Sequence, residues 1–162
     1  MAIIVIMKVL FCLLSLGLAA PLFAQDELIV LPEPSEPPFE IGDLPLESGY
    51  TIEREKAPDL NFRIVDNKMR LYWLDENGLI MEPEVPAVSL RFDERSIRET
   101  TRSFHRLKPL PDDTGLGSPY LLVVPHRYYI TLLIRQPGSE EVKSYRFRYL
   151  PAMDEVATPE SE

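Results

Sequence analysis

Short runs of alternating apolar and polar residues, separated by turn residues, fill most of the chain after residue 60. Val88, Leu90 and Phe92 alternate with Ser89 and Arg91, so an extended strand here would bury one face and expose the other. Further strands are predicted over residues 62–65, 69–74, 79–81, 100–107, 120–124, 127–136 and 141–150. The pattern predicts an antiparallel β-protein.

Turn residues separate these runs in the positions that hairpins require. Asn77-Gly78 favours a tight hairpin because both residues tolerate positive φ angles. Pro137-Gly138 has the residue types of a type II turn. Residues 108–119 are rich in Pro, Gly and Asp and predict a loop. Residues 96–104 are ambiguous: we favour a strand from residue 100, and a short helix is the alternative.

About seven strands in roughly 100 residues fit a single immunoglobulin-like antiparallel β-sandwich. A small β-barrel is the alternative. The Cys…Trp…Cys signature of immunoglobulin domains is absent, because Cys12 is the only cysteine in the sequence. Trp73 is therefore expected in the core but not against a disulfide.

The first 24 residues are typical of an export signal. Lys8 precedes the apolar run 9–18, and small residues follow near a cleavage site that we place after Ala24. Met7 is the more ordinary start for such a signal. We expect export to the periplasm or beyond the cell; the alternative is an uncleaved anchor in the inner membrane. Cleavage would remove Cys12, which excludes thiol catalysis and cysteine-ligated metals in the mature protein.

The net charge of −9 is concentrated at the two ends of the chain. Residues 26–47 contain seven acids and no base, and residues 154–162 contain four acids and no base. Between them, residues 48–153 are close to neutral, with 16 basic and 15 acidic residues. The predicted organisation is a signal peptide (1–24), an acidic Pro-rich linker (25–50), a β-sandwich domain (51–152) and an acidic disordered tail (153–162). Nucleic acid is not an expected partner.

The run 70–83, Arg-Leu-Tyr-Trp-Leu-Asp-Glu-Asn-Gly-Leu-Ile-Met-Glu-Pro, precedes a final strand that ends Tyr145-Arg146-Phe147-Arg148-Tyr149. This succession resembles small exported bacterial β-sandwich proteins and, more loosely, the immunoglobulin-like copper carriers of the periplasm. The resemblance covers residues 61–150 at most and implies a fold more than an activity. Copper carriers depend on His and Met ligands near an exposed edge, and no such motif is matched here.

Residues with catalytic or metal-binding potential are few after the signal. His105 and His126 with Met69, Met81 and Met153 are the residues available for copper, and Asp112-Asp113 for calcium. Gly115 to Pro119 has a glycine pattern without the helix that a phosphate-binding loop requires. Ser103 and Ser118 lack the local signature of a nucleophile. We therefore expect no cofactor, no metal and no enzymatic activity.

The arginines indicate a candidate function more clearly than the histidines, methionines and serines do. Arg91, Arg95, Arg98, Arg102 and Arg106 fall within sixteen residues, and Arg146 and Arg148 share a face of the last predicted strand. Guanidinium groups bind carboxylates and phosphates well, so we take Arg98, Arg102, Arg106, Arg146 and Arg148 as the candidate partner site. The expected partners are an envelope protein, an anionic envelope polymer or the acidic ends of the chain itself. The alternative is a solvated sheet face, balanced by Asp93, Glu94 and Glu99.

From these observations we expect a non-enzymatic binding or scaffolding module of the bacterial envelope. A small periplasmic copper carrier is the alternative function.

Overall fold

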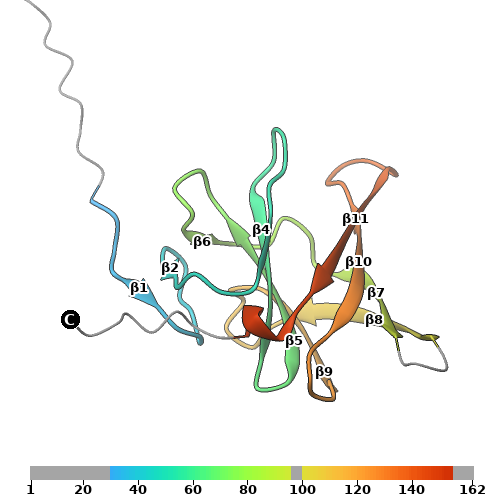
Figure 1. Cartoon of the computed structure of the whole chain (residues 1–162). Helices are drawn as coiled ribbons and strands as arrows, with labels where there is room; N and C mark the ends of the chain where they lie inside the picture. Colours follow the sequence, from blue (N-terminus) through green and yellow to red (C-terminus); the bar gives the residue numbers. More distant parts are fainter. Residues whose placement is uncertain (1–29, 96–99, 155–162) are drawn as a thin grey trace, which may run out of the picture. The chain divides into compact units, whose positions relative to one another are not determined.

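The computed structural model describes residues 30–95 and 100–154 (Figure 1). The predictions for the signal segment, for Arg98 and for the tail beyond residue 154 concern residues outside these ranges. Within them, no helix is long and apolar enough to cross a membrane.

Strands make up nearly all the regular secondary structure of the described chain. They are β1 (Pro34–Ser35), β2 (Leu44–Pro45), β3 (Tyr50–Ile52), β4 (Asp59–Val65), β5 (Lys68–Leu74), β6 (Ile80–Met81), β7 (Val88–Arg95), β8 (Thr100–Pro109), β9 (Leu116–Leu121), β10 (Tyr128–Arg135) and β11 (Val142–Tyr149). A single 3₁₀ turn, Pro151–Met153, follows β11. β1 and β2 pair with each other in parallel.

The other nine strands form one antiparallel sheet in the order β11-β10-β7-β8-β9-β5-β4-β3, with β6 paired to β5. The sheet is nearly closed into a barrel. β8 pairs with β7 along most of its length, but with β9 only through Lys108 and Pro109. The sheet therefore has two halves: the β7 half (β8, β7, β10 and β11) and the β5 half (β9, β5, β4, β3 and β6).

The predicted all-β class is confirmed. The sheet is consistent both with a sandwich, of which its two halves would be the layers, and with the small-barrel alternative. β10 lies between β7 and β11, so the strand predicted to be central is flanked on both sides. The core between the halves contains Trp73, Phe62 and Tyr149, each almost without exposure.

The region after β8 differs from the prediction. The glycine-containing run predicted as a loop forms strand β9, in which Gly117 pairs with both Lys108 and Arg70. A Cβ on Gly117 would lie 2.7 Å from the Leu110 side chain, so glycine here permits close packing of strands. The apolar residues Val123 and Val124 are instead exposed outside any strand.

The acidic Pro-rich segment also differs from an extended linker. Phe39 is buried against Tyr72 of β5, with their rings 5.0 Å apart at 82°. Backbone hydrogen bonds join Gly42 N to Ile80 O and Ile80 N to Asp43 O, both at 2.8 Å. Residues 39–46 thus cover the outer face of the β5 half, where Phe39, Tyr72, Leu74 and Ile80 form a second apolar cluster. The acids and prolines of this segment, on which the linker prediction was based, do not indicate that Phe39 packs on β5.

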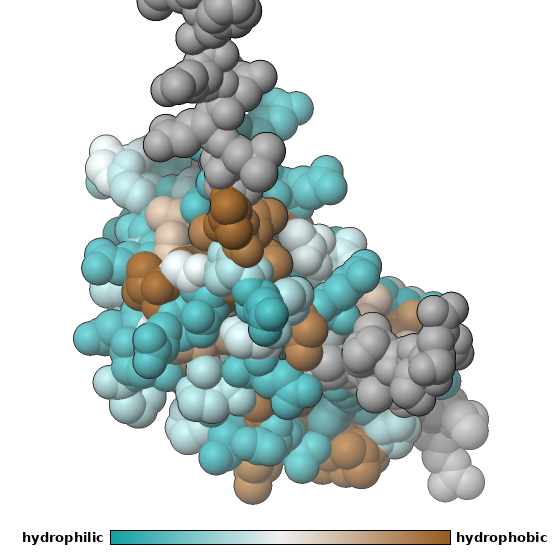
Figure 2. All heavy atoms as spheres, turned by 90° about the vertical axis from the view of Figure 1, so that its left-hand side faces the viewer, coloured by the Kyte–Doolittle hydropathy of each residue, from teal (hydrophilic) through white to brown (hydrophobic). Residues whose placement is uncertain are grey.

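The surface on the β1 and β2 side of the molecule is mostly hydrophilic, with small separated hydrophobic patches (Figure 2). This agrees with an outer layer that buries its apolar side chains inward.

Candidate functional site

The outer face of the β7 half carries most of the arginines of the folded region. Successive side chains of a strand point to opposite faces of a sheet. Val88, Leu90 and Phe92 of β7 are buried in the core, so Ser89, Arg91 and Asp93 point outward. Phe147 and Tyr149 of β11 are likewise buried, which directs Arg146 and Arg148 outward.

Strand register brings these outward residues into rows across four adjacent strands. In one row Arg102 pairs with Asp93, Asp93 with Tyr129, and Tyr129 with Arg148. The next row runs Phe104, Arg91, Thr131, Arg146, and the third runs Arg106, Ser89, Leu133, Ser144. Arg135 extends the surface beside Val142. We call this surface the arginine face; it comprises Ser89, Arg91, Asp93, Arg102, Phe104, Arg106, Tyr129, Thr131, Leu133, Arg135, Val142, Ser144, Arg146 and Arg148.

Four of the five arginines singled out from the sequence therefore share one face. Arg102 and Arg106 lie on β8, and Arg146 and Arg148 lie two strands beyond β7, on β11. Arg98 is outside the described residues. Arg91 belongs to the arginine run noted in the sequence but not to the candidate set of five, and Arg135 was not singled out. The alternation that directs both residues outward was visible in the sequence, but the register that places β7 and β10 between β8 and β11 was not.

The charge on this face is strongly unbalanced. Among its residues, six are arginines and Asp93 is the one acid. Asp93 Oδ1 lies 3.2 Å from Arg102 Nε and 3.6 Å from Arg91 Nε. Arg91 also donates a 3.3 Å hydrogen bond to Thr131 Oγ1. Asp93 thus neutralises one side of the face, whereas Arg106, Arg135, Arg146 and Arg148 lie on strands that contribute no acid to it.

Tyr129 occupies the centre of the β11 side. The guanidinium carbons of Arg146 and Arg148 lie 5.7 and 5.9 Å from the centre of its ring. Stacking on an aromatic ring orients a guanidinium while leaving its N–H edge available for a carboxylate or phosphate. Both arginines are exposed, so an incoming anion can reach them.

A surface hollow of about 920 Å³ adjoins the face beside the β10–β11 turn. Arg106 and Arg135 line it together with apolar atoms of Leu133 and Val142. Two acids, Glu84 and Glu140, also line the hollow, which therefore combines both signs of charge with an apolar surface. Its remaining lining residues are Val85, Pro86, Ala87, Ser89, Gln136, Pro137, Gly138 and Ser139.

The two histidines have different contacts. His105 stacks on Phe92 at a ring distance of 5.2 Å and lies 4.5 Å from the tilted ring of Tyr120, and burial lowers its pKa. His126 is buried and its Nδ1 lies 2.6 Å from Asp154 Oδ2. The Nε2 atoms of both have no hydrogen-bond partner.

The remaining metal and phosphate candidates have structural contacts. Met69 is fully buried, and Met81 and Met153 pack on the same core. Asp112 Oδ1 accepts hydrogen bonds from the Thr114 backbone and hydroxyl, as in an Asx turn. The described part of the chain contains no group of three or more His, Cys, Asp or Glu residues placed to hold a metal. Ser118 is buried, and its hydroxyl accepts a hydrogen bond from the Tyr120 backbone.

Comparison of the chain with models of protein families, with curated protein sequences and with solved structures finds no match. The arginine face is thus the feature on which a functional assignment depends.

Proposed function

We propose that this protein is a non-enzymatic binding module of the bacterial envelope and that its arginine face binds an anionic partner. The observation that carries the proposal is the concentration of six arginines around a single aspartate on four adjacent strands. The location outside the cytoplasm rests on the signal-like sequence of residues 1–24.

An anionic partner would reduce the electrostatic repulsion among the arginines of this face. Arg146 and Arg148 are two residues apart on β11, and Arg91 lies on β7, directly beside the strand that carries Arg102 and Arg106. Like charges at this spacing repel one another, and solvent only partly screens them. A carboxylate or phosphate between two guanidiniums replaces that repulsion with charge-assisted hydrogen bonds. The same positive field would also speed the encounter with an anionic partner.

The spread of the arginines favours a large or extended partner. β8 and β11 are separated by β7 and β10, so their backbones lie about 14 Å apart at the usual spacing of strands. A single small anion cannot contact both outer strands. A polymer or a protein segment with several carboxylates or phosphates can, and each additional contact then adds to the affinity without a new association cost.

Binding to long poly-L-glutamate, measured by fluorescence anisotropy at low salt, tests the proposal. We expect Arg102→Ala/Arg106→Ala and Arg146→Ala/Arg148→Ala each to weaken binding about tenfold, since each removes two charge contacts. The matched control is Lys56→Ala/Lys68→Ala, which removes two positive charges from outside the face and should change affinity less than twofold. Equal weakening in all three variants would contradict a specific face and indicate a response to net charge alone.

The copper-carrier alternative is tested on the same protein. Protein purified from the periplasm is analysed for metal. Copper in a one-to-one ratio, lost on replacing His105 or His126, would overturn the binding-module proposal.

A further inference from the structure

The sheet ends in two strands whose outer edges are unpaired within the described chain, β11 and β3. An edge strand presents backbone N–H and C=O groups that can pair with another extended chain. The two edges face one another across a groove of about 450 Å³, which is lined by residues 50–52 of β3, by Glu53 after it and by residues 144–147 of β11.

The groove is closed at one end. Gly49 N donates a 2.7 Å hydrogen bond to Met153 O, which joins the start of β3 to the turn after β11. Tyr149 accepts a hydrogen bond from Ile64 N and donates one to Asp154. These contacts hold the chain segments together at the Tyr149 end of β11. The groove lies toward the Ser144 end of β11, where no such bond joins the two edges in the described residues.

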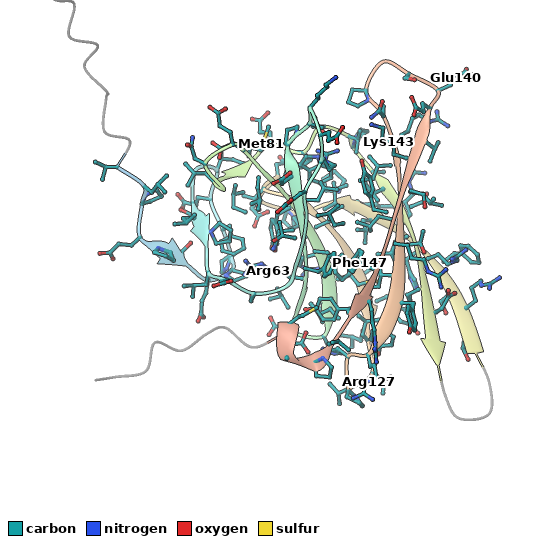
Figure 3. All side chains as sticks on the ribbon, turned by 45° about the horizontal axis from the view of Figure 1, so that its top comes forward. Arg63, Met81, Arg127, Glu140, Lys143 and Phe147 are labelled. Atoms are coloured by element: carbon teal, nitrogen blue, oxygen red, sulfur yellow. The ribbon has the colours of Figure 1, made fainter. Side chains whose placement is uncertain are left out.

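The two sides of β11 differ sharply in chemistry. Phe147 points from β11 into the space between the two halves of the sheet (Figure 3) and stacks on Tyr50 with ring centres 4.3 Å apart. Tyr145 lies on the same side, half-buried against the core. Arg146 and Arg148 point to the opposite side. A strand added to β11 would therefore have Lys143 and the apolar Tyr145 and Phe147 on its inner side and arginines on its outer side.

We propose that β11 binds an extended segment of a partner protein as an added β-strand, and that this segment alternates acidic with apolar residues. The proposal rests on the proposed function and identifies the part of its anionic partner that lies along β11 as an acidic extended segment. Side chains opposite each other on paired strands have Cβ atoms about 5 Å apart. Acidic residues on the outer side would thus reach Arg146 and Arg148, while the apolar residues would lie toward the Tyr50–Phe147 stack.

Charge favours a partner of this kind over a second copy of the same chain. Pairing two β11 edges would bring the Arg146 and Arg148 side chains of one copy close to those of the other. Such an interface would have no acid from either strand on its outer side. An acidic segment removes that repulsion, and main-chain hydrogen bonds supply the affinity, as in other cases of strand addition.

The probe is a capped seven-residue peptide that alternates valine with glutamate, measured against the full-length mature protein by titration calorimetry. We expect Arg146→Ala/Arg148→Ala to weaken binding at least tenfold and Arg102→Ala/Arg106→Ala, on the far strand β8, to change it less than twofold. A peptide of the same composition with its three glutamates consecutive should bind at least fivefold more weakly.

Backbone methylation of the peptide tests strand pairing directly. In a strand, the N–H groups of the glutamates point to one edge and those of the valines to the other. Methylating the nitrogens on the edge that pairs with β11 should lower affinity at least tenfold, and methylating the opposite set should change it less than twofold. Which set is sensitive reports whether the added strand is parallel or antiparallel.

The outcomes separate the two proposals. Equal binding of both methylated peptides, or no peptide binding while poly-L-glutamate still binds, would overturn strand addition and leave the arginine face in place. Loss of specificity for poly-L-glutamate as well would overturn the proposed function. A dimer in analytical ultracentrifugation that excludes the peptide, so that only monomer binds it, and that is not weakened by any peptide concentration would assign the β11 edge to a second copy and overturn the inference.

Discussion

The outer faces of the two halves of the sheet are organised in opposite ways. Residues 39–46 cover the β5 half, and Phe39 and Tyr72 are both about 2% exposed there. The outer face of the β7 half carries no such layer from the described chain, and its Phe104 is 70% exposed. The same sheet therefore uses one outer face to complete its own packing and leaves the other to solvent.

Arginine has a different role on each face. Arg63 of β4 is 3% exposed, and its partners are neutral: Asn61 Oδ1, the Leu46 carbonyl and the Phe39 ring. It lies between β4 and the covering segment (Figure 3), and burial lowers its pKa. Arg102 on the other face has a side chain that is 59% exposed. The comparison indicates that Arg63 is part of the fold, whereas Arg102 on the arginine face is exposed to solvent.

The largest expected effect comes from removing the aromatic ring on each face. Phe39→Ala should lower the free energy of unfolding by about 3 kcal/mol, because it empties a buried site between two layers. The control, Phe104→Ala, should change it by less than about 0.5 kcal/mol, since the ring is already in water. Urea unfolding followed by Trp73 fluorescence measures both. Similar losses in the two variants would mean that both outer faces contribute equally to stability.

The second largest effect on the free energy of unfolding is expected from arginine substitutions, which should differ between the two faces. Arg63→Met keeps the apolar stem but leaves the Leu46 carbonyl and Asn61 Oδ1 without their donor, at a cost of about 2 kcal/mol. Arg102→Met removes an exposed ion pair and should cost less than about 0.5 kcal/mol. The same urea experiment compares them. A larger loss for Arg102→Met would contradict the assignment of structural and partner-binding arginines.

A tyrosine on the covered face should make the free energy of unfolding fall at alkaline pH. Burial raises the pKa of Tyr72 to about 12, above its ordinary value of 10.0. Below pH 10 the phenol is protonated in both states; above it the unfolded chain loses the proton first, so stability falls as pH rises toward the folded pKa. By pH 11 this titration should lower the free energy of unfolding by about 1 kcal/mol.

Unfolding of wild type and Tyr72→Phe at pH 9 and pH 11 measures this term. The phenylalanine variant should show the smaller fall between the two pH values. Tyr149, whose pKa burial also raises, contributes equally to both proteins and leaves a residual fall. An identical fall in the free energy of unfolding of the two proteins would show that burial under residues 39–46 does not raise the pKa of Tyr72.

The smallest expected effect concerns the acid on the open face. Asp93→Asn removes the charge shared by Arg91 and Arg102 and should tighten poly-L-glutamate binding two- to fivefold, about 0.4 to 1 kcal/mol. Glu76→Gln, in the exposed turn before β6, changes net charge by the same amount and is the control. Weaker binding by Asp93→Asn would mean that Asp93 orients the arginines rather than competing for them.

Much of the sheet could be predicted from local patterns. Alternation located β7, β10 and β11, and the Asn77-Gly78 turn is observed between β5 and β6, with Gly78 at a φ of +79°. β3 and β9 could not be found this way. β3 has only three residues, and β9 contains Gly117, whose use in a strand depends on Leu110 and Arg70 packing close to it.

The candidate site was predicted only in part for the same reason. The sequence identified Arg102, Arg106, Arg146 and Arg148 as a chemical group, since their residue type and strand spacing are local properties. Arg91 was noted in the same run but left out of the candidate set, and Arg135 and Tyr129 were not included, because their proximity to the set depends on β7 and β10 lying between β8 and β11.

The sequence by itself determined the all-β class, the strand periods, the charge of each segment and the chemistry available to the chain. These properties depend on neighbouring residues and on composition. Only the tertiary structure decided that Phe39 covers one outer face, that six arginines share the other, and that β11 and β3 face each other across a groove. Such relations are set by strand register and by contacts between residues far apart in the chain, which no local pattern encodes.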